Sequence, residues 1–348
     1  MSKKQDLKSL TRKDLISWFK ENNIQRFRAE QTFNWIYKNY ISDFQEMANL
    51  PQKLRTRLKT ISYITDLSLK DRLKADDGTI KYLWELIDGY TIESVFIPYP
   101  SGKRYSVCIS TQVGCAMGCK FCATGMMGLD RSLKAGEIVD QVLKMEKDVE
   151  KNISNVVFMG MGEPLDNIDN LISAIKILNS DQGMNIGARK MTVSTAGVVP
   201  GIKRLANWEK QIGLAISLNA SNDKLRNKIM PINKKYPLKV LLEAVKNYIN
   251  KKNRRVTFEY VLIKDINDSE KYARQLGNLL ANILCHVNLI PVNPVPDLNI
   301  ERPSQHITEK FKKTLSDSGV NVTVRKERGS TIQAACGQLR YIEDKRGN

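Results

Sequence analysis

The apolar residues of the first 75 positions repeat every three or four residues, the spacing that buries one face of a helix. Three such stripes occur, and their members are Leu15, Ile16 and Phe19, then Ala29, Phe33, Ile36 and Tyr37, then Leu54, Leu58 and Ile61. Thr11 and Asp14 have the spacing of an N-terminal cap before the first stripe, and Pro51 suits the first turn of the third helix. We therefore predict a small helical domain over residues 1–75.

From residue 80 onward the pattern changes to an alternation that is typical of strands. The alternating positions are Tyr82, Trp84 and Leu86, followed by Ile92, Ser94 and Phe96. Asp88-Gly89 lies between the two sets, and this dipeptide is favoured in tight hairpin turns. We predict a β-hairpin extension over residues 76–100.

Beyond this hairpin, short β-type runs alternate with helical stripes such as Ile138, Val139, Val142 and Leu143. Six runs occur, at 107–110, 156–158, 191–194, 212–218, 257–263 and 287–290. Alternating strands and helices predict a parallel sheet with its active site at the carboxyl ends of the strands. We therefore predict an α/β fold with a partial (β/α)6 barrel over residues 101–330, followed by a C-terminal loop and tail over 331–348.

No apolar run approaches the roughly 20 residues that a membrane-spanning helix needs. The 348 residues are 42% hydrophobic and 26% charged, which is ordinary for a globular protein with an ample core. The first residues, from Met1 to Asp6, are polar and do not form the apolar segment of a secretory signal. We expect a cytoplasmic protein that has no membrane partner.

The chain is strongly basic, with 55 Lys and Arg residues against 37 Asp and Glu and a net charge of +18. This excess favours a polyanionic partner, because neutralised phosphates release counterions and so supply affinity. The predicted helical domain carries sixteen basic against eight acidic residues, which fits an accessory RNA-binding module. The net charge could instead reflect a solvated, lysine-rich surface. The helical domain could likewise be a basic structural cap that only covers the core.

Three of the six cysteines are close together, as Cys115, Cys119 and Cys122 in the spacing C-x3-C-x2-C. Three thiolates can hold three irons of a cubane cluster and leave the fourth iron open to a ligand. A structural zinc site is the alternative, but it needs four ligands and commonly a second pair of cysteines. No second pair follows here, which favours an iron–sulfur cluster.

With aromatic Phe121 before its last cysteine, this loop resembles that of the radical S-adenosylmethionine (SAM) superfamily. The resemblance implies a [4Fe–4S] cluster on Cys115, Cys119 and Cys122, with SAM bound at the open iron. In that superfamily, reductive cleavage of SAM yields a 5′-deoxyadenosyl radical, so the cofactor carries the difficult chemistry. Residues 162–164, Gly-Glu-Pro, follow one βα unit later and match the stretch that binds the methionyl ammonium group in the superfamily.

Within the superfamily, nearly the whole chain resembles the methyltransferases that modify C2 of adenine in 23S rRNA and tRNA. The matching blocks are 92–95, 108–115, 160–165, 193–195, 231–233, 290–294 and 334–339. The resemblance implies SAM contacts at Gly162, Glu163, Ser194, Ser217, Leu218, Asn219 and Asn293. Asn219 departs from the family, which has His there. Because asparagine does not titrate near neutrality, we expect no acid–base role at this position.

The same resemblance implies three catalytic residues. Cys336 would be methylated first, because C2 of adenine is too electron-poor to attack SAM, whereas a thiolate attacks readily. A second SAM would activate this methyl group for addition to C2. Glu93 would then accept the C2 proton, and Cys108 would release the product through a transient Cys108–Cys336 disulfide. Taken singly, each residue also has a structural interpretation, as a small buried thiol, a loop cysteine or a solvated carboxylate.

Three other functions stay open. The nearest is a Cfr-type enzyme, which methylates C8 of the same rRNA adenine and shares the cluster and both cysteines. An iron–sulfur RNA-binding protein without catalysis would not need Cys108 and Cys336, and a glycyl-radical activase would not need the basic helical domain. The expected partners are 23S rRNA, tRNA and an electron donor such as flavodoxin or ferredoxin, and the expected state is a monomer.

Overall fold

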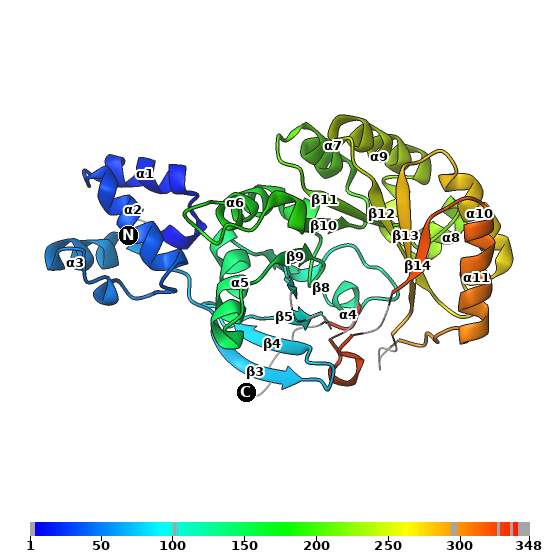
Figure 1. Ribbon diagram of the computed structural model, residues 1–348, viewed down its shortest axis with the longest axis horizontal. Coiled ribbons are helices and arrows are strands. Elements are labelled where there is room, and N and C mark those ends of the chain that lie inside the picture. Colours follow the sequence, from blue (N-terminus) through cyan, green and yellow to red (C-terminus); the bar gives the residue numbers. More distant parts are fainter. Residues whose placement is uncertain are drawn as a thin grey trace.

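A sheet of ten strands forms the centre of the molecule, in the order β14-β13-β12-β11-β10-β9-β6-β5-β4-β3 (Figure 1). The computed structural model describes residues 4–99, 102, 104–293, 298–325, 328–334 and 337–339. The strands of this sheet are β3 (Ser68–Lys74), β4 (Ile80–Glu85), β5 (Thr91–Pro98), β6 (Tyr105–Cys108), β9 (Asn155–Phe158), β10 (Met191–Thr195), β11 (Gly213–Ser217), β12 (Val256–Leu262), β13 (Cys285–Pro291) and β14 (Val322–Val324).

From β6 to β14 the neighbouring strands pair in parallel, with helices in every connection. These helices are α4 (Ala123–Met126), α5 (Ala135–Val149), α6 (Ile168–Leu178), α7 (Val199–Asn207), α8 (Asp223–Ile229), α9 (Leu238–Lys252), α10 (Glu270–Leu280) and α11 (Gln305–Asp317). Helices α7, α9, α10 and α11 lie along the outer side of the curved sheet (Figure 1). The predicted partial (β/α)6 barrel is confirmed, and β14 adds a short parallel strand that the sequence pattern did not indicate.

Side chains on β12 alternate between the two sides of the sheet, as the two-residue period of a strand requires. The ring of Tyr260 lies 5.3 Å from that of Phe311 on α11, so Tyr260 faces the outer helices. Its neighbours Glu259 and Val261 project to the opposite side, and both line a cavity there. The inner face of the sheet therefore holds polar residues in a place where a helix-covered parallel sheet is usually apolar.

The antiparallel extension consists of β3, β4 and β5, with β5 paired to β6. The expected hairpin turn lies between β4 and β5, and Gly89 there has φ +83°, which glycine adopts without strain. All seven residues of β3 are exposed. This strand lies within residues 1–75, for which a helical domain was predicted. Its polar residues show no strand pattern in the sequence.

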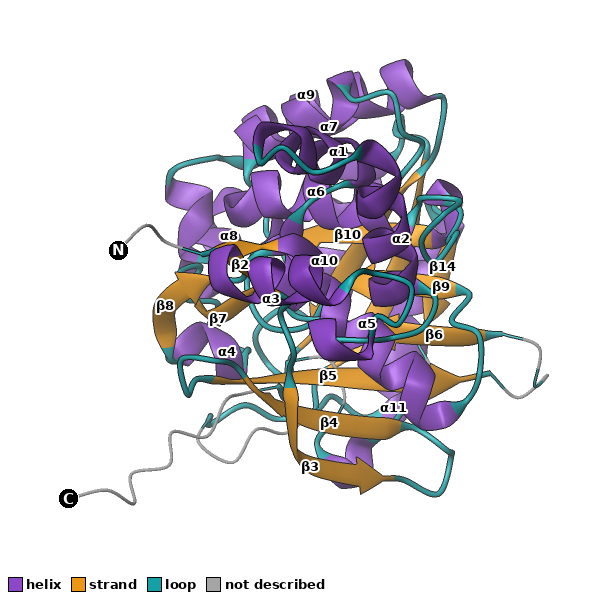
Figure 2. Ribbon diagram, turned by 90° about the vertical axis from the view of Figure 1, so that its left-hand side faces the viewer, coloured by secondary structure: helices purple, strands orange, loops and turns teal. Residues whose placement is uncertain are grey.

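The N-terminal helices form a separate group at one end of the molecule, and Figure 2 views them from that end. They are α1 (Arg12–Glu21), α2 (Arg26–Tyr37) and α3 (Gln52–Ile61), and the short strands β1 (Gln5–Asp6) and β2 (Ser62–Tyr63) pair in parallel beside them. Leu15, Phe19, Phe33, Ile36 and Leu58 are buried between them, as the helical spacing predicted. No helix in the described part of the chain is long and apolar enough to cross a membrane.

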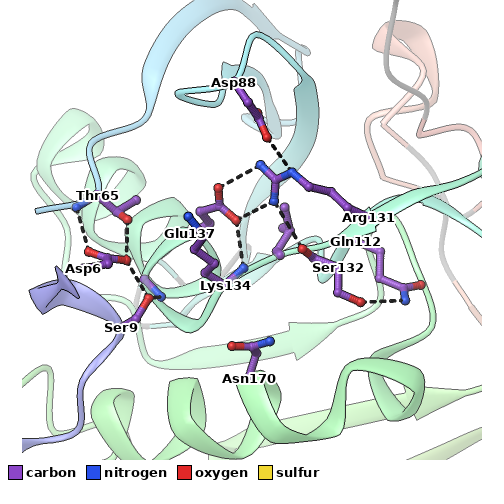
Figure 3. Close-up of polar contacts among 12 residues, drawn as sticks. Asp6, Ser9, Thr65, Asp88, Gln112, Arg131, Ser132, Lys134, Glu137 and Asn170 are labelled. Carbon is purple, nitrogen blue, oxygen red and sulfur yellow. Dashed lines mark hydrogen bonds and ion pairs between the residues drawn. The ribbon is translucent and has the colours of Figure 1, made fainter. Parts of the chain in front are cut away.

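Buried polar contacts attach this helical group to α5 of the barrel. The Lys8 ammonium donates to Asp140 Oδ1 at 2.6 Å, and both side chains are almost fully buried. Asp6 accepts hydrogen bonds from the hydroxyl groups of Ser9 and Thr65, while Ser9 Oγ accepts one from the backbone N–H of Gly136 (Figure 3). Because breaking a buried pair leaves an uncompensated charge, these contacts fix the helical group against the barrel.

Candidate active site

The three clustered cysteines lie in a loop that begins at the end of a small two-stranded sheet, β7 (Gln112–Cys115) with β8 (Gly128–Ser132). Arg131 of β8 holds this sheet in place, because its guanidinium binds Asp88 at 2.6 Å and Glu137 at 2.8 Å (Figure 3). Gly114 has φ +74°, and a Cβ there would lie 2.1 Å from the carbonyl oxygen of Gly128. Only glycine therefore permits this approach of the two strands.

Cys115, Cys119 and Cys122 line one cavity, which we call the cysteine cavity. Burial raises the pKa of Cys115 to about 12 and also raises the pKa of Cys119, so a bound cation is needed to hold them as thiolates. Among the described residues, no three His, Cys, Asp or Glu side chains converge closely enough for a single metal ion. Three thiolates that line one cavity can each bind a different iron of a cluster.

Glu163 lies across the cysteine cavity, in the turn after β9. Its oxygens accept hydrogen bonds from the backbone N–H groups of Leu165 at 3.0 Å and Ala196 at 2.7 Å. The side chain is buried without a Lys or Arg partner in the described chain, and burial raises its pKa to about 7. A buried carboxylate of this kind is a ready partner for the ammonium group of a ligand.

Gly162, just before this carboxylate, adopts φ +99°. A Cβ at this position would lie 2.5 Å from the Cβ of Gln112, whose side chain in turn accepts a hydrogen bond from the Glu163 N–H at 2.8 Å. The glycine thus permits close contact between the turn after β9 and the strand that leads to Cys115.

Most of the cofactor positions that the sequence predicted come together at this cavity. Its lining includes Gly162, Glu163, Ser194, Ser217, Asn219 and Asn293. Leu218 is different, because its side chain packs in the hydrophobic core and does not line the cavity.

Asn219 has a structural task that accounts for its residue type. Its φ is +56°, a region where asparagine is more frequent than most residues. Its side-chain oxygen accepts a hydrogen bond from the backbone N–H of Val261 at 2.8 Å, and Asn267 donates to its carbonyl oxygen at 2.9 Å. The side chain therefore joins the ends of β11 and β12.

Two functional positions were missed by the sequence analysis. Arg226 is fully buried and donates hydrogen bonds to the carbonyl oxygens of Leu218, Ala196 and Ser217. Glu259 lines the cysteine cavity from β12. Glu259 is a charged residue in the otherwise largely apolar strand β12, but its meaning depends on which strands are neighbours. Arg226 lies among other polar residues of α8, so the sequence around it carries no signal of its burial.

A second cavity, which we call the arginine cavity, adjoins the first and is lined by Arg302, Arg325 and Arg328. Asn293 and Gly160 line both cavities, so the two spaces are direct neighbours. Guanidinium groups at the mouth of an enzyme cavity are suited to phosphate groups, which they bind with bidentate hydrogen bonds.

Cys108 lies half-buried at the end of β6 and lines the arginine cavity. Cys336, the other predicted catalytic cysteine, lies outside the described residues. The described residues on either side of it, Ala334 and Gly337, line the same cavity as Cys108. The carbonyl oxygen of Gly337 also accepts a hydrogen bond from the N–H of Ala123 at 2.8 Å, directly beside Cys122.

Glu93 lies on β5, and the register places its side chain on the same face of the sheet as that of Cys108. This follows because Cys108 is paired with Val95, two residues after Glu93. The carboxylate is 6% exposed and forms an ion pair with Lys81 of β4 at 2.9 Å. The lysine compensates the charge of this buried carboxylate.

Fold and cavity together define the class of protein, and comparison with known families agrees: this is a radical SAM enzyme. Residues 109–276 match the model of the Radical SAM superfamily, and residues 5–64 match the "Ribosomal RNA large subunit methyltransferase N-terminal domain". A radical SAM methyltransferase from Sphaerobacter thermophilus has a similar crystal structure, with a TM-score of 0.92 and 46% identity over 97% of this chain and 99% of that one.

Curated relatives narrow the class further. A probable dual-specificity RNA methyltransferase RlmN from Bacillus mycoides is 47% identical over 99% of this chain and 95% of its own length. A protein of the same description from Caldicellulosiruptor saccharolyticus is 48% identical over 96% of both chains. The chain belongs to the RlmN family of radical SAM RNA methyltransferases.

Proposed function

We propose that this RNA methyltransferase forms 2-methyladenosine in 23S rRNA, in the peptidyl-transferase region, and in tRNA, at the adenosine 3′ to the anticodon. One observation carries the proposal: Cys108 and the described residues nearest to Cys336, Ala334 and Gly337, line an arginine-rich cavity that adjoins the cysteine cavity. Methyl transfer through a cysteine requires one cysteine to carry the methyl group and a second to release the product. Arginines beside them would bind the phosphates of the RNA. The reaction would take place in the cytoplasm, with the protein as a monomer and with flavodoxin or ferredoxin as electron donor.

The residues of the cysteine cavity fit a [4Fe–4S] cluster and SAM. Cys115, Cys119 and Cys122 would hold the cluster, and the uncompensated carboxylate of Glu163 would bind the methionyl ammonium group. Further SAM contacts would come from Gly162, Ser194, Ser217, Asn219 and Asn293, whereas the Leu218 side chain packs in the hydrophobic core. When bound, cluster and SAM supply the methyl group and the radical that abstracts hydrogen, at a cost of two SAM per methylation.

The chain's own residues would carry the methyl group to the RNA and release it. The Cys336 thiolate takes the methyl group first, and its sulfur then holds the carbon that bonds to C2. Glu93, which pairs with Lys81, accepts the C2 proton, and the one electron left over from radical addition would return to the oxidised cluster. The Cys108 thiolate attacks Cys336 Sγ, so that an S–S bond forms while the bond from sulfur to the transferred carbon breaks. That carbon takes up a proton to become the methyl group, and a reductant restores both thiols.

Mass mapping of the methylated adenosine tests this function. We expect anaerobically reconstituted protein to give 2-methyladenosine in 23S rRNA and tRNA fragments. The Cys119→Ala variant should give no product, because it lacks a cluster ligand, while Cys285→Ala should be as active as the wild type because Cys285 is buried in β13 away from both cavities. Formation of 8-methyladenosine would instead assign the protein to the Cfr-type enzymes. Stoichiometric zinc in active protein would contradict the proposal that the three cysteines hold an iron–sulfur cluster.

We further propose that the N-terminal helices bind RNA phosphates. Lys53 and Arg57 are exposed one turn apart on α3. Replacing both with Ala should weaken RNA binding and reduce the slope of log affinity against log salt by about 2, as expected for the loss of two phosphate contacts. Lys239 and Lys246 share an exposed face of α9 and provide the matched double-alanine control. Equal slopes for both variants would leave the helical group as a structural cap.

A further inference from the structure

The loop that carries the three clustered cysteines, residues 115–122, borders two further hollows besides the cysteine cavity. Cys122 lines the arginine cavity, where we expect the RNA. Met117 lines the cysteine cavity and also a groove that is bounded in part by exposed residues, which we call the outer groove. The outer groove and the proposed cluster site are therefore neighbours across a single side chain. Ala116 and Lys120 of the same loop are exposed.

The outer groove has an apolar wall at the carboxyl edge of the parallel sheet. Its apolar residues Leu165, Ile168, Val198, Ile232 and Tyr236 come from the connections that follow β9, β10 and β11. Parallel strands bring these connections to one edge of the barrel, which is also the edge of the cysteine loop. Among the described residues, the outer groove shares none with the arginine cavity. A protein seated in the outer groove would therefore leave the arginine cavity open to RNA.

One wall of the outer groove belongs to a strongly basic segment. Residues 224–242 supply part of the lining, including Lys235, and contain six Lys or Arg residues with no Asp or Glu. Five of these six basic residues are exposed, and only Arg226 is buried. The Lys120 N–H donates a hydrogen bond to the carbonyl oxygen of Ile229 at 3.0 Å, so the same segment lies directly against the cysteine loop.

The rest of the outer groove carries little charge. Its other charged lining residues are Asp166 and Arg204, and Arg204 forms an ion pair with Asp169 at 2.5 Å. These three side chains leave one net negative charge against the five exposed basic residues of 224–242. An apolar groove with a basic edge suits an acidic protein surface, because opposite charges steer the partner and the apolar wall supplies contact area. RNA phosphates would also be attracted, but the apolar wall offers them no hydrogen-bond donor.

We propose that the outer groove is the docking site of the electron donor, an acidic carrier protein that presents its redox cofactor to Met117. The inference rests on the proposed [4Fe–4S] cluster at the three cysteines. One electron leaves the reduced carrier and reduces the oxidised cluster before SAM is cleaved, so the carrier is oxidised by one electron. Electron transfer slows with distance, and the outer groove brings the carrier to within one side chain of the cluster site. Interfaces of electron carriers are typically small and transient, so a groove with a charged edge is sufficient.

The double variant Lys234→Glu/Lys235→Glu tests this docking site. Reduced flavodoxin is mixed anaerobically with cluster-loaded protein, and the visible absorbance of the cluster reports the second-order rate of its reduction. We expect the variant to lose a factor of about ten or more at low salt and much less in about 0.5 M salt, where surface charges are screened. Calorimetry with oxidised flavodoxin should show weaker binding by the variant at low salt. Lys246→Glu/Lys271→Glu, which reverses two exposed lysines on α9 and α10, is the matched control and should behave as the wild type.

Dithionite, a small reductant that needs no docking surface, separates this inference from the proposed function. With dithionite, both double variants should reduce the cluster and cleave SAM at the wild-type rate. Equal rates of reduction by flavodoxin in the two double variants would overturn the inference, and so would an equal loss of rate with dithionite. Weaker RNA binding by Lys234→Glu/Lys235→Glu with unchanged flavodoxin binding would assign these lysines to RNA instead. If wild-type protein holds no cluster, or cleaves no SAM with dithionite, the proposed function itself fails.

Discussion

Cys108→Ala protein is expected to accumulate as a covalent adduct with RNA that survives denaturation. In the proposed mechanism Cys108 would act only after Cys336 has been joined to C2, so the variant should still hold its cluster, cleave SAM and methylate Cys336. Multiple turnover should fall by at least about 100-fold, because the proposed release step needs the Cys108 thiol as its nucleophile. The measurement is a denaturing gel with labelled RNA, followed by mass analysis of the crosslinked peptide.

Three controls make this experiment decisive. Cys336→Ala and the double variant should form no adduct, because the methyl-carrying sulfur is absent. Cys285→Ala removes a buried cysteine from β13 that lines neither cavity, and this variant should turn over normally. Release of methyladenosine by Cys108→Ala at the wild-type rate would show that Cys108 is only a small side chain at the end of β6.

Arg226→Met should destabilise the fold and weaken SAM binding together. The guanidinium donates to three backbone carbonyls, at 3.0 Å to Leu218, 2.6 Å to Ala196 and 3.2 Å to Ser217, and also to the side chain of Asn233. Burial lowers the pKa of Arg226 to about 10, so the side chain is charged at neutral pH. Methionine fills a similar volume but leaves these buried acceptors without a donor, each at a cost of about 1–3 kcal/mol.

We therefore expect Arg226→Met to lower the midpoint of thermal unfolding by about 6 °C or more, the shift that corresponds to about 3 kcal/mol in a large domain. SAM affinity should fall because Ala196 and Ser217, which Arg226 ties together, line the cysteine cavity. Differential scanning fluorimetry and calorimetry measure the two effects. Arg204→Met removes an exposed arginine that pairs with Asp169 and should change neither. An unchanged midpoint in Arg226→Met would refute the bridging role.

The fold could be predicted largely from local patterns. Short β-type runs between helical stripes located the strands of the barrel, and alternating apolar residues around Asp88-Gly89 located the hairpin. Both signals depend only on neighbours in sequence. β14 could not be found in this way, since its three residues are too few to show a period. Its pairing with β13 is decided by contacts across the sheet.

The functional site likewise has one part that local sequence patterns predict and another that only contacts across the sheet determine. The cysteine spacing and the Gly-Glu-Pro turn are local, so the sequence was sufficient to predict them. Glu259 acquires its meaning only from its partners in the register, Ser217 on one side and Asn288 on the other. Lys81 likewise becomes relevant only when β4 pairs with β5 and places its ammonium group 2.9 Å from Glu93.

The exposed strand β3 has a consequence for how the protein behaves at high concentration. β3 is hydrogen-bonded only to β4 among the described strands, so its outer side can serve as a template for a strand of another molecule. Its sequence, Ser-Leu-Lys-Asp-Arg-Leu-Lys, carries four charges in seven residues. A second copy pairing edge to edge would bring like charges together, and β3 thereby protects an open barrel from self-association and aggregation.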